Sequence, residues 1–122
     1  MKIGIAAVLV MVTVPACAQT MNAEQFYQRA TALKKKGAMA IFSGGEIKAL
    51  TAEGQAAAKA AREQRLAAAK VGRPQRYCPP AGPQGMKSDE FMNRLGAIPP
   101  AERAKIDMTE ATNRLLAVKY PC

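Results

Sequence analysis

The 122-residue chain contains no histidine and only two serines, Ser43 and Ser88. Histidine is the commonest general base in enzymes and a frequent metal ligand, so its absence removes the usual centre of acid–base and metal chemistry. Both serines stand where a helix is expected to begin, which favours a capping role over a nucleophilic one. Cys78 and Cys122 show neither the C-x-x-C spacing of redox proteins nor the ligand set of a zinc site. The sequence therefore predicts a protein that is not an enzyme and has no cofactor or metal.

Acidic residues are also scarce, with nine Asp and Glu against 18 Lys and Arg, a net charge of +9. Carboxylates in the first turn of a helix stabilise its positive end. That position alone accounts for most of the acidic residues without an acid–base role: Glu24, Glu46, Asp89, Glu90 and Glu110. The positive balance favours an anionic partner.

A long apolar run occurs only at the N-terminus, where residues 3–14 follow Met1 and Lys2. A charged start, a short apolar middle and small residues at a cleavage point are typical of a secretory signal peptide. We expect it to cover residues 1–18, with cleavage between Ala18 and Gln19. A retained membrane anchor is the alternative, but crossing the hydrocarbon takes about 20 apolar residues.

Lipid attachment at Cys17 is a further alternative, which Pro15 disfavours. We therefore expect a periplasmic protein in which residues 19–122 form one domain. Cleavage leaves two cysteines, Cys78 and Cys122, and an even pair in an oxidising compartment is typical of one disulfide. Two free thiols are the alternative. A bridge would stabilise the fold by about 4 kcal/mol in the loop-entropy model, which suits a chain with only three Phe and three Tyr.

Helix start and stop signals divide the first half of this domain. The first predicted helix covers residues 23–36, between an N-cap at Asn22 and a stop at Gly37. A second helix of about 28 residues begins at the Ser43 cap and ends before Gly72. Its distal part is expected to lie in solvent, and its buried stripe is predicted to consist of Ile47, Leu50, Gly54, Ala57 and Ala61.

The second half begins with residues 73–87, where four prolines exclude regular structure. Three shorter helices are predicted after it, over residues 88–98, 101–106 and 108–120. Asp107 is the expected N-cap of the last one, whose apolar stripe is Met108, Ala111, Leu115 and Val118. Since no segment alternates as a strand does, the predicted class is all-α: a small domain of about five helices, one of them long, closed by one disulfide.

The C-terminal third carries two sequence signatures, "RYCPP" and "SDEFMNRLGAIPPAERAKIDMTEATNRLLAVKYPC". An aromatic-Cys-x-Pro opening, a helix pair with intervening prolines and an aromatic-Pro-Cys ending resemble the Rap/Tai family of type VI secretion immunity proteins over residues 76–122. The resemblance implies a small, exported, all-helical protein that inhibits a peptidoglycan amidase toxin. It also implies that Cys78 and Cys122 are the bridging cysteines, that a secreted amidase effector is the partner, and that a homodimer forms.

The alternative function is a cationic periplasmic protein that binds an anionic polymer or lipid surface of the cell envelope. Nucleic acid is not expected, because an exported protein rarely meets it and no stacking aromatic residues accompany the basic ones. Under either function, the candidate contact residues are the cations Lys34, Lys35, Lys36, Arg62, Arg65, Lys70, Arg73 and Arg76.

Overall fold

The computed structural model describes residues 20–122, so the predicted signal peptide, its cleavage site and Cys17 lie outside the described residues. Five α-helices and one 3-10 helix make up this part of the chain: α1 (Ala23–Lys36), η1 (Gly37–Ser43), α2 (Gly44–Lys70), α3 (Ser88–Ala97), α4 (Pro100–Arg103) and α5 (Met108–Lys119). The predicted all-α class is confirmed, and β-pairing over residues 20–122 is limited to one isolated bridge between Asn22 and Asp107. No helix in the described part is both long and apolar enough to cross a membrane.

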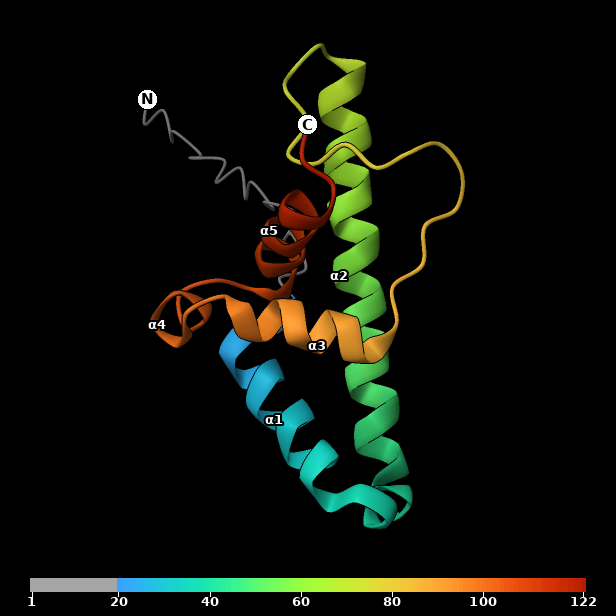
Figure 1. Ribbon diagram of the computed structural model, residues 1–122, viewed down its shortest axis with the longest axis vertical. Helices are drawn as coiled ribbons and strands as arrows, with labels where there is room; N and C mark the ends of the chain where they lie inside the picture. The colour runs from blue at the N-terminus through green and yellow to red at the C-terminus, as the bar shows by residue number, and fades with distance from the viewer. Residues whose placement is uncertain (1–19) are drawn as a thin grey trace, which may run out of the picture.

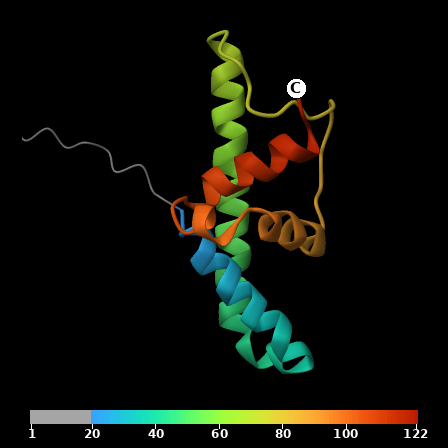
Figure 2. The same cartoon turned by 60° about the vertical axis from the view of Figure 1, so that its left-hand side comes forward.

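The 27-residue helix α2 runs the length of the molecule, and the other helices pack along it (Figure 1). Helix α1 accompanies the first part of α2, and α5 crosses its middle (Figure 2). The helix continues through Gly54 without interruption and has its C-cap at Val71. Gly72 then adopts a φ of +72°, and its N–H donates to the carbonyl of Ala69 while that of Arg73 donates to Ala68. This Schellman motif requires a residue free to adopt a left-handed conformation, which confirms the predicted stop.

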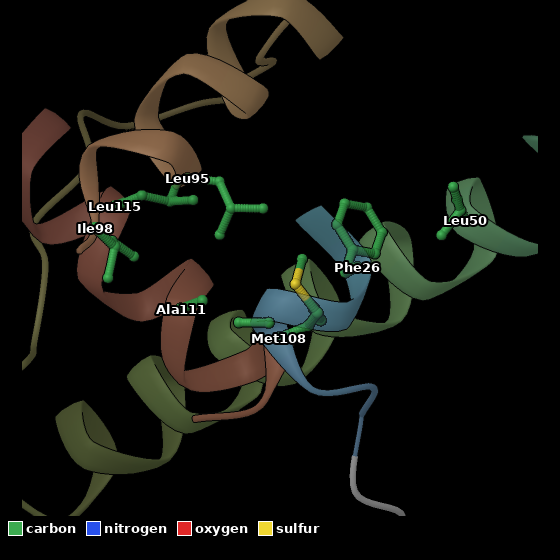
Figure 3. Close-up of a cluster of buried hydrophobic side chains, with 9 residues drawn as sticks. Phe26, Leu50, Leu95, Ile98, Met108, Ala111 and Leu115 are labelled. Atoms are coloured by element: carbon green, nitrogen blue, oxygen red, sulfur yellow. The ribbon is translucent and has the colours of Figure 1, made fainter. Parts of the chain in front are cut away.

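A small cluster of apolar side chains from α1, α2, α3 and α5 forms the core, around Phe26, Leu95 and Met108 (Figure 3). The predicted stripes are confirmed at their buried positions: Leu50, Ala57, Ala61, Met108, Ala111 and Leu115. They are wrong at Ile47 and Val118, which are 40% and 76% exposed. Ile47 lies beside η1, and Val118 lies at the open rim between α3 and α5. The apolar periodicity of a helix can continue beyond the part of the helix that another element covers. The periodicity therefore overestimates the burial of Ile47 and Val118.

The predicted helix caps are also partly confirmed and partly wrong. Asn22 accepts a hydrogen bond from the N–H of Gln25, and Asp107 accepts one from the N–H of Glu110, so both predicted caps are confirmed. The predicted serine caps are wrong. Ser43 ends η1, which runs directly into α2, and its hydroxyl lies 3.2 Å from Lys36 Nζ instead of capping. Ser88 is already inside α3, at its first position, and makes no cap bond.

The predicted disulfide between Cys78 and Cys122 is present, with an S–S distance of 2.01 Å. The N–H of Cys78 also donates to the carbonyl of Tyr120 at 2.8 Å. The carboxyl end therefore lies against the connector that follows α2 (Figure 1). Two hydrogen bonds from the Arg76 guanidinium to Glu110 add a contact between the same connector and α5. The bridge thus closes the half of the molecule that contains α3, α4 and α5.

Candidate functional site

A buried guanidinium, which no sequence signal identifies, holds the short helix α4 against the core. Arg103 is only 3% exposed, and its Nε donates to Glu24 at 2.6 Å. Its Nη1 faces three carbonyls at the C-terminal end of α3, at 3.4 Å for Leu95, 3.2 Å for Gly96 and 2.6 Å for Ile98. A helix leaves its last carbonyls without internal partners, so Arg103 supplies donors that α3 lacks. This cluster is structural, and it fixes α1, α3 and α4 relative to one another.

The candidate contact residues fall into two groups at opposite ends of α2. Lys34, Lys35 and Lys36 form the last turn of α1, at the lower end in Figure 1. The second group belongs to the distal part of α2 and the connector after it, at the upper end. The sequence does not distinguish these positions, whereas the structure separates them by most of the length of α2. They cannot serve one compact site together.

At the lower end the chain reverses through η1, and we call residues 34–47 the hairpin tip. Two large apolar side chains of this segment are largely exposed, Phe42 at 78% and Met39 at 63%, and Ile47 is 40% exposed. The three lysines of α1 are exposed beside them, as is Lys48 at the start of α2. The tip thus combines an exposed aromatic side chain with exposed lysines that lie near it along the chain. The lysines are among the contact residues predicted from the sequence, whereas Phe42 is not.

The hairpin tip is held in place from its base. Arg29 of α1 donates to both carboxylate oxygens of Glu46 in α2, each at 2.6 Å. These hydrogen bonds lower the pKa of Glu46 below its ordinary value, although desolvation opposes the shift. Gly37 ends α1 with a φ of +53°, and its N–H donates to the carbonyl of Lys34. Two helices joined by a bidentate ion pair therefore present the apolar residues on a fixed support.

At the upper end, two of the five predicted contact residues are engaged within the protein. The guanidinium of Arg65 lies 5.4 Å from the centroid of the buried Tyr77 ring, and Arg76 is paired with Glu110. The predicted solvent exposure of α2 beyond Ala61 is therefore wrong on one face, since Tyr77 covers it. The remaining three cations are exposed: Arg62, Lys70 and Arg73.

The surface also contains two shallow depressions. One, of about 240 Å³, lies along α1 and includes Tyr27 and Lys35; the other, of about 160 Å³, lies between α3 and α5 and includes Ile98 and Val118. Small-molecule sites usually enclose about 300 to 1,000 Å³. Over residues 20–122, no three side chains of the metal-ligating types come together. The hairpin tip and the outer face of α2 are two exposed candidate surfaces for recognition.

Comparison of the chain with models of protein families, with curated proteins and with solved structures finds no match.

Proposed function

We propose that this protein is an exported, non-catalytic inhibitor that blocks a peptidoglycan amidase of type VI secretion by inserting its hairpin tip into the enzyme's cleft. The observation that carries the proposal is Phe42, a large aromatic side chain left 78% exposed at the projecting end of a helical hairpin. Aromatic anchors that enter a pocket of the partner supply much of the binding energy in protein complexes. The likeness of residues 76–122 to the Rap/Tai immunity proteins supports the same function.

The contacts that hold the hairpin tip in place favour tight binding. Ordering a flexible loop on association costs free energy, and a loop already held in place avoids much of that cost. In this chain α1 and α2 flank the tip, and the Arg29–Glu46 pair joins them at its base. The disulfide between Cys78 and Cys122 adds a covalent constraint to the body that carries the hairpin. Phe42 and Met39 would therefore reach the partner already arranged.

The charge of the tip favours a partner with an acidic cleft. The exposed lysines of residues 34–36 precede the apolar residues along the chain, and Lys48 follows them. Complementary charges raise the association rate and discriminate against partners of the wrong sign. The inhibitor would cover the cleft as a rigid body and would carry out no chemistry. The homodimer implied by the family resemblance stays a prediction.

The test is inhibition of peptidoglycan hydrolysis by a secreted amidase encoded beside this protein. We expect the purified protein to inhibit it with one-to-one stoichiometry, and Phe42→Ala to weaken inhibition by about tenfold or more, as loss of an anchor residue does. Val118→Ala is the matched control, because Val118 is equally exposed but lies between α3 and α5. Unchanged inhibition by Phe42→Ala would place the contact elsewhere, and wild-type protein that inhibits no such amidase would reject the function.

A further inference from the structure

The face of α2 that points away from the rest of the molecule has an unusual composition. Its buried residues, Leu50, Ala57 and Ala61, define the inner face. A helix has 3.6 residues per turn, so the opposite face contains one residue from nearly every turn. We call these residues the outer stripe, and all of them are exposed: Lys48, Ala52, Gln55, Lys59, Arg62, Leu66 and Lys70.

The outer stripe carries four cations, and the one anion on the same face is Glu63. Arg73, just beyond the helix, adds a fifth exposed cation near its upper end; its backbone is held by the Schellman bond to Ala68. Two of the three acidic residues of α2 make contacts toward the body of the protein: Glu46 pairs with Arg29, and Glu53 accepts the N–H of Met21 at 3.1 Å. The third, Glu63, is exposed on the outward face itself, 4.0 Å from Lys59. Positive charge is thus concentrated on the outward face.

This arrangement has a cost in the absence of a partner. Like charges three or four residues apart on a helix repel each other, as Lys59 and Arg62 do here. A helix face that only faces water is normally stabilised by charges of both signs. Occupation of the stripe by negative charge would remove the repulsion along it.

We propose that the outer stripe binds a linear polyanion, such as an acidic polymer of the cell envelope, laid along α2. The stripe from Lys48 to Lys70 extends over roughly 33 Å, at 1.5 Å per residue, and α2 is straight in both views (Figures 1 and 2). Its cations are distributed along the whole helix, so one phosphate could contact only neighbours such as Lys59 and Arg62. A membrane surface would need a wider apolar face, and Leu66 is the only large apolar residue in the row. This surface is separate from the one that contains Phe42. The sequence predicts an anionic envelope partner as an alternative, and the proposal assigns that partner to one face of α2.

The test compares polyphosphate chains longer than the stripe with triphosphate, by calorimetry of the full mature chain at several salt concentrations. We expect the long chain to bind at least about tenfold more tightly than triphosphate, with an affinity that falls steeply as salt rises, because binding releases counterions. The triple variant Lys59→Gln/Arg62→Gln/Lys70→Gln should lose about tenfold or more in affinity and show a shallower salt dependence. Glu63→Gln should bind more tightly than wild type.

The matched control is Lys34→Gln/Lys35→Gln/Lys36→Gln, which removes the same charge from the hairpin tip. We expect this variant to bind polyphosphate within about twofold of the wild-type affinity. Its three substituted lysines lie outside the outer stripe, and salt screens their electrostatic attraction to a polyanion bound there. Equal losses in the two triple variants would overturn the proposal in favour of net charge alone. Equal affinities for triphosphate and the long chain would indicate a compact anion site, and preference for vesicles of anionic lipid would indicate a membrane surface; either result rejects it. Amidase inhibition by the stripe variant is a separate measurement, so the two proposals can fail independently.

Discussion

Asn22 and Asp107, the N-cap residues of α1 and α5, lie side by side in an antiparallel bridge. The first backbone N–H of each helix donates to the carbonyl that precedes the other cap (Ala23 to Ile106, 2.9 Å; Met108 to Met21, 2.8 Å). The opening turn of a helix has N–H groups without internal partners, and here each helix obtains one acceptor from the other. The two ends of the domain's sequence are joined at this point.

Exchanging amide for carboxylate should affect stability differently at the two N-cap residues. Asn22 uses both ends of its amide: Oδ1 accepts from Gln25, and Nδ2 donates to the carbonyl of Ala104 at 2.9 Å. Asn22→Asp keeps the cap but loses that donor, so we expect a loss of about 1 kcal/mol in the free energy of unfolding. Asp107 acts only as an acceptor in these contacts, so Asp107→Asn should cost about 0.5 kcal/mol or less. Urea unfolding measures both, and equal effects would contradict this division of roles.

Removing the buried guanidinium should destabilise the fold more than any surface change. Arg103→Met leaves Glu24 without its cationic partner and the end of α3 without its side-chain donor, so we expect a loss of about 3 kcal/mol. Arg62→Met, on the exposed face of α2, is the control and should change stability by less than about 0.5 kcal/mol. Chemical unfolding of the two variants decides the matter. Similar stabilities would mean that Arg103 does not organise the core.

Two helical glycines should respond to alanine with opposite signs. A Cβ at Gly96 would lie 2.9 Å from Tyr27 Oη and 3.2 Å from Tyr27 Cε2, and the guanidinium of Arg103 lies 4.0 Å from the centroid of the same ring. The ring therefore has little freedom to move, and Gly96→Ala should destabilise the protein by about 1 kcal/mol or more. A Cβ at Gly54 meets nothing within 4 Å, so Gly54→Ala should stabilise the protein by up to about 1 kcal/mol. Thermal unfolding of both variants tests the difference in sign.

Local signals in the sequence were sufficient for most of the secondary structure. Helix α1 has the predicted bounds because its signals, the Asn22 cap and the Gly37 stop, act within a few residues. The serine caps failed because capping requires a break in the helical backbone, and η1 leads into α2 without one. The apolar stripes are wrong at Ile47 and Val118, which are exposed, and Gly54 is only partly buried. Whether a neighbour is present is a tertiary property that periodicity does not contain.

The contacts that determine the candidate sites were harder to predict, because they join distant parts of the chain. Arg103 and Glu24 are separated by 79 residues, and neither has a neighbouring signal that indicates the other. The first-turn glutamates were explained by the helix dipole, but each of Glu24, Glu46, Glu90 and Glu110 also accepts a bond from a cation. The exposure of Phe42 could not be predicted for the same reason. An apolar residue between two helices is exposed or buried according to what packs over it.

Acid should destabilise the protein in a defined range of pH. Four glutamates have their pKa lowered from the ordinary value of 4.5, chiefly by a hydrogen bond from a cation: Glu24 from Arg103, Glu46 from Arg29, Glu90 from Lys119 and Glu110 from Arg76. A lowered pKa in the folded state means that the stabilisation is fully present above the unfolded-state value and is lost as pH falls through the folded-state values. We expect constant stability from about pH 6 to 8, where the chain has no histidine to titrate, and a steady decline below about pH 4.5.

Urea midpoints measured across this range check the prediction, and Arg103→Met should show a shallower decline because the pKa of Glu24 would return toward its ordinary value. A loss of stability between about pH 6 and 7 would contradict the assignment to carboxylates, whose ordinary pKa values lie well below that interval.

Reduction of the bridge between Cys78 and Cys122 should lower stability while leaving the hairpin tip assembled. The two cysteines are 44 residues apart, so the loop-entropy model gives a loss of about 4 kcal/mol, comparable to the whole stability of a domain with so small a core. The Arg29–Glu46 pair lies outside the closed loop and does not depend on it. Hydrogen exchange of the Cys78→Ser/Cys122→Ser variant should therefore show faster opening of α3 and α5 than of the α1–η1–α2 hairpin. Uniform acceleration would mean that the hairpin has no stability apart from the bridged half, and the rigid support proposed for Phe42 would then depend on the disulfide as well.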